Sequence, residues 1–421
     1  MSKKLISLLL ALTLLALTAC ATGTASSGKN TVSTQPTGEN ENQYAQVSTA
    51  AAKEIKIGYY GQAAEYMDLY PEDFGLGNTD YNIERINYGT DEAGQKRLIL
   101  DVNRGELDLV VCDGQIETGT GFADLYDFID TDSELTREDF PDWLLDGLEE
   151  RGHLNQLWGC YVVNTLKAKN ALAQEPSPLT LKNCKAYIEA NDIDSELFDS
   201  YIIKEQLLDY IAPPIMREAF DLEQGSFNFK SEHIKALIAL CNTQPESFDW
   251  ELAMQENGIQ NSEVLEWVSL GGTNSIDDKE LEYREPGRFF NVDENLTYVS
   301  CAPKCCYMIP ENSVNKEAAW NYLHTLLLPE WQVKYYEMRH FGLPSNLTAR
   351  SSVLNKYAAS ETIAVVNSLL DNPAVYGGEQ RVMCRMFTAE MQRYFHGDSS
   401  LDDALDMAES KLNIRYSEQY G

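Results

Sequence analysis

The chain carries nine cysteines, five histidines and sixty-six acidic residues, the side chains that most often perform catalysis or bind metal ions. Their spacing matches no G-x-S-x-G nucleophile motif, no H-E-x-x-H zinc motif and no phosphate-binding loop. The segment CAPKCC groups Cys301, Cys305 and Cys306, but no histidine stands at ligand spacing from them. The segment DTDSELTRED, which begins at Asp130, lacks the glycine and the glutamate of a calcium loop. We therefore expect no catalytic residue, no metal site and no cofactor.

Aromatic and carboxylate side chains that follow predicted strands are candidates for binding rather than catalysis. Aromatic rings present apolar faces, and carboxylates accept hydrogen bonds from hydroxyl groups, which suits an uncharged polar solute. Tyr59 and Tyr60 follow the first predicted strand, and Asp113 and Gly114 follow the third. The alternative is structural: a tyrosine in a strand is more often a core residue, and Asp113 could cap a turn.

These candidates depend on a strand–helix–strand unit near the start of the folded body. EIKIGYYG alternates apolar and polar residues, and residues 81–88 repeat the alternation, so both segments predict strands. A helix is predicted over 91–105, between Asp91 as start and Gly105 as stop. The apolar segment 106–114 predicts a buried strand. This order favours an α/β fold with a parallel sheet covered by helices.

The remainder of the chain is predicted to be mostly helical. Helical spacing covers the segments 179–191, 196–211 and 231–241, and a further strand is predicted over 291–303. Specific residues mark the limits of the last helices: Asn315 as a cap, Pro329 in a first turn, Gly342 and Pro344 as a stop, and Ser400 with Asp403 as a capping box.

The N-terminus reads as an export signal followed by a tether. Lys3 and Lys4 precede an apolar run that ends at Cys20, which is too short for a comfortable membrane span. The residues Leu-Thr-Ala-Cys resemble the lipobox of bacterial lipoproteins, in which the cysteine becomes the lipid-bearing N-terminus. We expect residues 1–19 to be a signal peptide and 20–52 a lipidated Cys20 with a flexible tether. The alternatives are an ordinary cleaved signal or an uncleaved anchor.

Composition limits the possible partners. The formal net charge of the 421 residues is -33, which repels phosphate backbones and anionic lipid headgroups. Nucleic-acid binding is therefore not expected, and the lipid alone should contact the membrane. Hydrophobic residues make up 43% of the chain, enough for two domains of ordinary size. Several cysteines other than Cys20 lie in apolar strings, and most of them should be small buried residues.

Four stretches occur in order along the chain: GQKRLILDVNRGELDLVV, FADLYDFIDTD, YMIPENSVNKEAAWNYLHTLLLPEWQ and AEMQRYFHGDSSLDDALDMAESKL. Together they resemble the family 1 extracellular solute-binding proteins of bacterial ABC importers, which include maltose- and other sugar-binding proteins. The segment between Trp250 and Phe290 departs from the family's Gly-Lys-x-Ala-Met pattern.

The resemblance implies a two-lobed periplasmic-binding-protein-like (type II) α/β fold with a hinge and an interlobe cleft. Lobe I would comprise 53–130 plus 297–345, and lobe II 131–296 plus 346–421. The ligand would lie in the cleft, near the carboxyl ends of the strands. That placement adds four aromatic candidates to those named above: Trp158, Tyr161, Trp267 and Tyr376.

By the same resemblance, the chain would be a monomeric, lipid-anchored protein on the outer face of the cytoplasmic membrane. It would capture a solute, most simply a sugar or oligosaccharide, and deliver it to separate ABC permease subunits. Two alternatives stay open: a surface lipoprotein that degrades or adheres to glycans, and a ligand-sensing subunit of a membrane kinase. Acidic pairs such as Glu149 and Glu150 could supply a glycosidase dyad, but most acidic residues form a solvated face.

Overall fold

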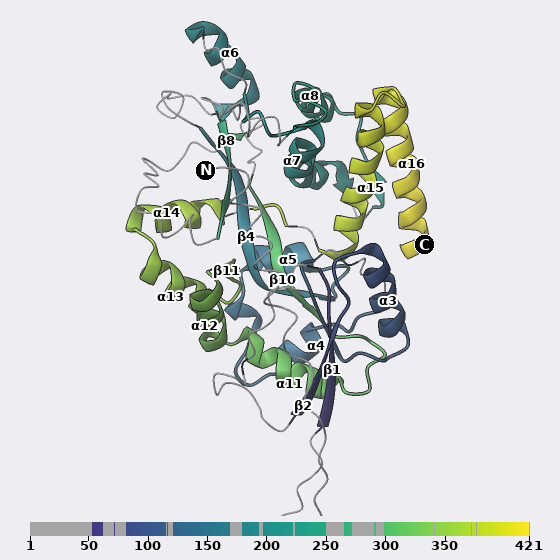
Figure 1. Cartoon of the computed structure of the whole chain (residues 1–421), viewed down its shortest axis with the longest axis vertical. Coiled ribbons are helices and arrows are strands. Elements are labelled where there is room, and N and C mark those ends of the chain that lie inside the picture. The colour runs from purple at the N-terminus through teal and green to yellow at the C-terminus, as the bar shows by residue number, and fades with distance from the viewer. Residues whose placement is uncertain are drawn as a thin grey trace, which may run out of the picture. The chain divides into compact units, whose positions relative to one another are not determined.

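A computed structural model (Figure 1) gives the structure of most of the chain after residue 52. It describes residues 53–61, 71, 81–114, 116, 121–168, 179–192, 197–221, 224–249, 265–271, 290–291, 299–340, 342–371, 373–375 and 377–420. The predicted signal peptide, Cys20 and the tether lie outside the described residues. Residues 51–421 form one compact unit.

The predicted strand–helix–strand unit is confirmed. Strand β1 (Lys53–Tyr59) pairs in parallel with β2 (Tyr81–Asn87) on one side and with β3 (Leu109–Cys112) on the other. Helix α3 (Glu92–Asn103) connects β2 to β3, and its N-cap Asp91 accepts a hydrogen bond of 2.7 Å from the Gly94 amide. The turn after α3 contains Gly105 at φ +68°, which glycine adopts without strain.

The remainder of the sheet is antiparallel, so the sheet is mixed rather than parallel throughout. The long strand β10 (Val299–Met308) pairs with β3 on one edge and with β4 (Leu157–Ala168) on the other. Strands β8 (Leu265–Leu270) and β11 (Leu343–Pro344) both pair antiparallel with β4. The sheet order is therefore β11-β4-β10-β3-β1-β2, with β8 attached to β4.

Helices that pack on the sheet form the first of two hydrophobic cores, which we call the sheet core. It contains Ile55, Ile57, Trp158 and Tyr336, all almost fully buried. Besides α3, the helices of this core are α4 (Tyr126–Ile129), α5 (Asp142–Leu148), α11 (Lys316–Leu327), α12 (Pro329–Arg339), α13 (Leu347–Tyr357) and α14 (Ser360–Leu369), and a short 3-10 turn, η2, spans Arg137–Asp139.

Helices α7 (Lys204–Ala219), α8 (Glu232–Cys241), α15 (Gly378–Phe395) and α16 (Leu401–Tyr420) form the second core, which we call the helical core. Figure 1 shows α15 beside α16, with α7 and α8 next to them. The buried residues Phe229, Phe387 and Leu412 belong to it. The short elements of this region are β5 (Leu179–Thr180), α6 (Leu181–Asn191), β6 (Phe220–Asp221), β7 (Ser226–Phe227) and β9 (Phe290–Asn291).

Helix boundaries follow the predicted caps with two exceptions. Pro329 opens α12, and the Ser400 hydroxyl accepts a hydrogen bond of 3.2 Å from the Asp403 amide at the start of α16. Helix α12 ends earlier than predicted, at His340 in the left-handed conformation. Helix α7 begins eight residues after the predicted start at residue 196 and runs eight residues beyond the predicted end at residue 211. It continues through Pro213 because later residues such as Met216 are buried in the helical core.

The two cores do not coincide with the predicted lobes. The sheet core includes Leu144, Trp158 and Val366, which the prediction assigned to lobe II. Since residues 51–421 group as one compact unit, the lobe boundaries stay a prediction.

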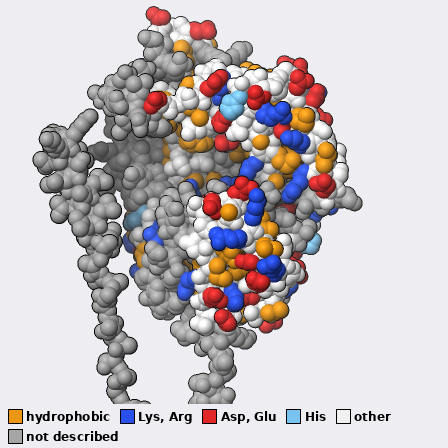
Figure 2. Space-filling model, turned by 45° about the vertical axis from the view of Figure 1, so that its right-hand side comes forward, with side chains coloured by type: hydrophobic (Ala, Val, Ile, Leu, Met, Phe, Trp, Pro, Cys, Tyr) orange, Lys and Arg blue, Asp and Glu red, His pale blue; other side chains and the backbone are white. Residues whose placement is uncertain are grey.

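The surface carries charges of both signs. On the face shown in Figure 2, acidic side chains are interspersed with lysines and arginines rather than gathered in one patch. Within the described part of the chain, none of the helices combines the length and the apolar character needed to cross a bilayer.

Candidate functional site

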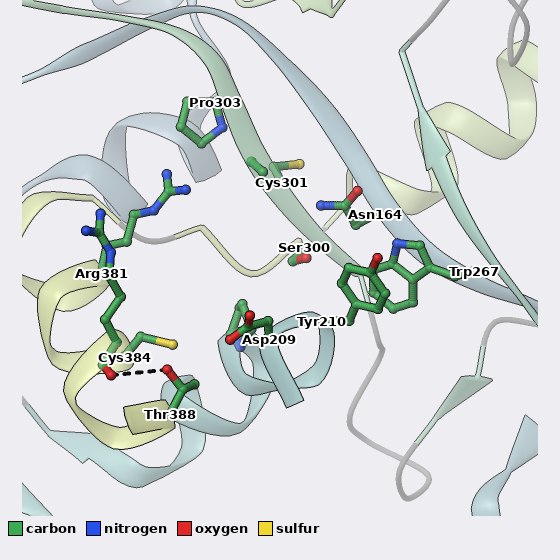
Figure 3. Close-up of a pocket in the computed structure, with 13 residues that line it drawn as sticks. Asn164, Asp209, Tyr210, Trp267, Ser300, Cys301, Pro303, Arg381, Cys384 and Thr388 are labelled. Atoms are coloured by element: carbon green, nitrogen blue, oxygen red, sulfur yellow. Dashed lines mark hydrogen bonds between the residues drawn. The ribbon is translucent and has the colours of Figure 1, made fainter. Parts of the chain in front are cut away.

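A pocket of about 410 Å³ lies where strands of the sheet face α7 and α15 (Figure 3). One wall comes from β4, β8 and β10 and the other from the two helices, so the sheet core and the helical core both contribute. The volume falls within the range of about 300–1,000 Å³ typical of small-molecule sites. The lining residues are Asn164, Asp209, Tyr210, Pro213, Trp267, Ser300, Cys301, Ala302, Pro303, Arg381, Cys384, Arg385 and Thr388.

A stacked pair of rings forms one side of the pocket. The ring centroids of Tyr210 on α7 and Trp267 on β8 lie 4.2 Å apart, and the ring planes differ by 11°. Both side chains are half-buried. Burial raises the pKa of the Tyr210 hydroxyl, and the charge of Asp209 adds to the effect, so the hydroxyl stays protonated at neutral pH. The pair offers flat apolar surface with a hydrogen-bonding group at its edge.

Helix α15 presents a polar stripe to the pocket. Arg381, Cys384, Arg385 and Thr388 stand at positions i, i+3, i+4 and i+7, which share one face of a helix. The Thr388 hydroxyl donates a hydrogen bond of 3.1 Å to the Arg385 carbonyl (Figure 3). A different face of α15 packs into the helical core through Met383, Phe387 and Met391. The same amphipathic helix therefore anchors one core and lines the pocket.

The two guanidinium groups of this stripe differ in exposure. Arg381 is half-buried, whereas Arg385 is exposed. Burial lowers the pKa of Arg381, and repulsion from Arg385 lowers it further, although arginine stays charged at any physiological pH. Among the described residues, neither guanidinium has a hydrogen-bonding or ion-pairing partner. Figure 3 shows Arg381 on the opposite side of the pocket from Tyr210 and Trp267.

Asp209 is the acidic side chain of the described pocket lining. It is exposed to solvent on the pocket side, yet the surrounding protein removes enough water to raise the pKa of its carboxyl group to about 6. The nearby charge of Glu205 contributes in the same direction. Asp209 therefore changes from a hydrogen-bond donor to an acceptor-only group within one to two pH units of neutrality.

The thiols in and around the pocket do not indicate a reactive site. Burial raises the pKa of the Cys384 thiol to about 12 and that of Cys305 to about 12, so both stay protonated at neutral pH. As expected for most of the cysteines, Cys112, Cys160, Cys241, Cys301, Cys305 and Cys306 are free and buried. In the part of the chain that the structure describes, no three histidine, cysteine or acidic side chains gather as a metal site requires.

Of the residues predicted from sequence, Trp267 lines the pocket directly. Asp113 and Gly114 do not line it but lie behind one wall. A Cβ atom placed on Gly114 would lie 2.7 Å from Nη1 of Arg381. Asp113 is buried, and its charge raises the pKa of both Arg381 and Lys304 against the effect of burial. The pair at 113 and 114 therefore supports the guanidinium side of the pocket.

The four aromatic residues Tyr59, Tyr60, Trp158 and Tyr161 lie in the sheet core and do not line the pocket. Tyr60 donates a weak hydrogen bond of 3.4 Å to the Thr90 carbonyl, and the Tyr161 hydroxyl accepts one of 3.0 Å from Arg350. Tyr376 and Cys20 lie outside the described residues, so their predicted roles stay predictions.

Sequence reasoning missed Asp209, Tyr210, Arg381 and Arg385. The two arginines stand at i and i+4 in the sequence, but no helix was predicted there, and such a pair usually marks a solvated face. Asp209 and Tyr210 lie within the helix predicted over 196–211, and nothing in the sequence indicated which of its faces would line a pocket. Only the packing of α7 beside α15 makes these residues part of one pocket.

Comparison with known proteins identifies the fold. No protein-family model and no curated protein sequence matches the chain. The sugar-binding protein MalE from Xanthomonas citri is similar in structure, with a TM-score of 0.63 and 12% identity over 87% of this chain and 98% of that chain. An ABC transporter solute-binding protein from Thermotoga lettingae, bound with α-D-tagatose, has a TM-score of 0.58 and 13% identity over 86% and 100% of the two chains.

A third similar structure is a periplasmic oligogalacturonide-binding protein from Yersinia enterocolitica in complex with saturated digalacturonic acid. Its TM-score is 0.57, with 11% identity over 87% of this chain and 100% of that chain. At these identities the likeness concerns the fold rather than the ligand. The chain therefore has the two-lobed, periplasmic-binding-protein-like α/β fold of ABC solute-binding proteins, as the sequence predicted.

Proposed function

We propose that the chain is the solute-binding component of an ABC importer and that it captures a sugar in the pocket between the sheet and helices α7 and α15. The observation that carries the proposal is the stacked Tyr210–Trp267 pair, with ring centroids 4.2 Å apart, beside polar side chains in a pocket of about 410 Å³. The C–H faces of a sugar pack on such rings, while its hydroxyl groups need hydrogen-bonding partners.

Polar groups around the rings supply those partners. Asn164 offers an amide that both donates and accepts, and the hydroxyls of Ser300 and Thr388 do the same. They come from β4, β10 and α15, so a bound sugar would contact both walls of the pocket. A ligand that contacts both walls stabilises the conformation in which they are close, which is how a solute would drive closure in this fold.

The proposal extends to location and partners through the N-terminal sequence. A signal peptide over 1–19, lipidation of Cys20 and a tether to residue 52 would hold the folded unit on the outer face of the cytoplasmic membrane. Separate ABC permease subunits would receive the sugar there. Metabolic labelling with palmitate tests the anchor: the wild-type chain should incorporate label and Cys20→Ser should not, whereas equal labelling of both would contradict lipidation at this residue.

Calorimetric titration of the full-length chain with a panel of mono- and disaccharides tests sugar binding. A true ligand should also raise the thermal midpoint, since a ligand at a hundred times its dissociation constant adds about 2.7 kcal/mol of stability. Trp267→Ala should weaken binding, and Trp143→Ala is the matched control. Trp143 is half-buried against Tyr161 and does not line the pocket. If no sugar binds, or if both variants lose binding equally, the proposal is wrong.

A further inference from the structure

The arginine side of the pocket indicates the charge of the ligand, which the ring side does not. Arg381 and Arg385 are adjacent on one face of α15 and both line the pocket. Two like charges at i and i+4 repel each other, so the arrangement destabilises the free protein. A half-buried guanidinium such as Arg381 also loses part of its hydration, which needs compensation by a hydrogen-bonding partner.

Among the described residues, neither guanidinium has a hydrogen bond or an ion pair, although the charge of the buried Asp113 acts on Arg381. Another charged side chain of the same helix does have ion-pair partners. Glu390, also on α15, is almost fully buried and forms ion pairs with both Arg393 and Lys411. The charge of Glu390, near the C-terminal end of α15, is thus paired, whereas Arg381 and Arg385 nearer its N-terminal end stay available to a ligand.

Residue 114 has no space for a side chain beside Arg381. Gly114 has φ +78°, and a Cβ atom there would lie 2.4 Å from Cγ of Pro303 and 2.7 Å from Nη1 of Arg381. Asp113 is the buried carboxylate whose charge acts on Arg381 from behind this wall. Arg381 and Arg385, the two cations of the pocket lining, outnumber it, so this side of the pocket is positive on balance.

That local balance contrasts with the chain as a whole. Acidic residues outnumber lysine and arginine two to one, and the formal net charge is -33. Such a chain repels anions at long range, so an anionic ligand needs a local group of cations to be held. A neutral sugar needs no such group.

We propose that the solute is an acidic sugar, a uronic acid or an oligomer of uronic acids, whose carboxylate is bound by Arg381 and Arg385 while its ring packs beside Tyr210 and Trp267. This inference rests on the proposed function. The planar guanidinium fork matches a carboxylate with two parallel N–H···O bonds, which gives specificity as well as affinity. Figure 3 shows the rings and Arg381 on opposite sides of one pocket, so one ligand could reach both.

Calorimetric titration of the full-length chain with matched sugars tests the inference. The probes are galacturonic acid, its methyl ester, galactose and galactose 6-phosphate, with the corresponding gluco and manno series and the uronic acid dimers. We expect one acid to bind about ten- to hundredfold more tightly than its ester and its neutral parent, which corresponds to charge-assisted hydrogen bonds. Tightest binding of the phosphate would overturn the assignment to a carboxylate.

Variants separate ligand binding from a structural role. Arg381→Gln should abolish the preference for the acid, leave the affinity for the neutral parent within about twofold, and leave the thermal midpoint of the free protein unchanged or higher. The control is Arg97→Gln on α3, which removes the same charge from an exposed position outside the pocket and should alter none of these values. If Arg381→Gln lowers the thermal midpoint and weakens acid and neutral sugars alike, Arg381 is structural and the inference fails.

The outcomes also separate the two proposals. Equal binding of acid and neutral sugars overturns the acidic-sugar inference and leaves the proposed function intact. Binding of no probe overturns both.

Discussion

The two sides of the pocket are built differently, and the difference separates affinity from specificity. On one side, Tyr210 and Trp267 come from a helix and a strand of different sequence regions and stack on each other. On the other, Arg381 and Arg385 come from a single helix and repel each other. Apolar surface attracts any sugar with an exposed C–H face, whereas a pair of cations discriminates by charge. The same pocket can therefore bind by its rings and select by its arginines.

The largest expected effect on stability comes from replacing Gly114, which lies against Pro303 and Arg381. Gly114→Ala should destabilise the protein by about 3 kcal/mol, because the left-handed backbone costs about 1–2 kcal/mol for an L-residue and the new methyl group overlaps Pro303 and Arg381. Chemical denaturation measures the loss.

Gly152→Ala is the matched control for that change. Gly152 has φ +84°, but a Cβ atom there would meet nothing within 4 Å, so only the backbone cost of about 1–2 kcal/mol applies. Equal losses for the two variants would show that neither Pro303 nor Arg381 occupies the space beside residue 114.

The ring side should give a smaller effect that is independent of ligand charge. Trp267→Ala should weaken acidic and neutral sugars alike by about 2 kcal/mol, roughly 30-fold, because it removes half of the stacked pair. Titration with a uronic acid and its neutral parent measures both. A loss of affinity confined to the uronic acid would contradict the proposal that the rings bind any sugar and the arginines select the acid.

Asp209 should make stability depend on pH in a predictable direction. The pKa of its carboxyl group is about 6 in the folded protein, compared with 3.8 for an unperturbed aspartate. Between these values the unfolded chain releases the proton and the folded chain keeps it, so the contribution of this group to stability falls as pH rises and the loss is complete above about pH 6.

Asp209→Asn should therefore raise the thermal midpoint at pH 7.5 and leave it nearly unchanged at pH 4, as measured by thermal denaturation. Asp402→Asn, in the first turn of α16 and exposed, is the control and should show no such gain at pH 7.5. An equal gain for Asp209→Asn at both pH values would contradict the raised pKa.

The smallest expected effect is a gain in stability from removing the exposed arginine. Arg385→Gln should stabilise the free protein by about 0.3 kcal/mol, because a like-charge pair at i and i+4 is relieved. The gain should be largest at low salt, since exposed charges are screened. Denaturation at two salt concentrations measures it, and a loss of stability would indicate that Arg385 has a partner in the free protein.

The fold was largely predictable because its local signals agree with its packing. Asp91, Pro329 and Ser400 mark helix starts that the structure confirms, and the alternation in 53–59 places Ile55 and Ile57 in the core. The extension of α7 through Pro213 was not predictable, because burial of residues beyond the proline outweighs a local preference to end the helix.

The pocket was less predictable because it depends on which face of each helix and strand packs into a core and which face stays open to the pocket. Tyr59 and Tyr60 stand at a strand end as predicted, yet they are packed into the sheet core. Trp267 was placed by family resemblance and does line the pocket. Arg381 and Arg385 were not among the predicted site residues, since residues of α7, more than 160 positions earlier, complete the pocket with them.

A crystal structure of the protein with the tightest-binding sugar of the panel tests the central claim most directly. We predict that the sugar occupies the pocket between the sheet and helices α7 and α15, with its ring beside Trp267 and its carboxylate on Arg381. A sugar bound at any other surface, with this pocket empty, would contradict the account.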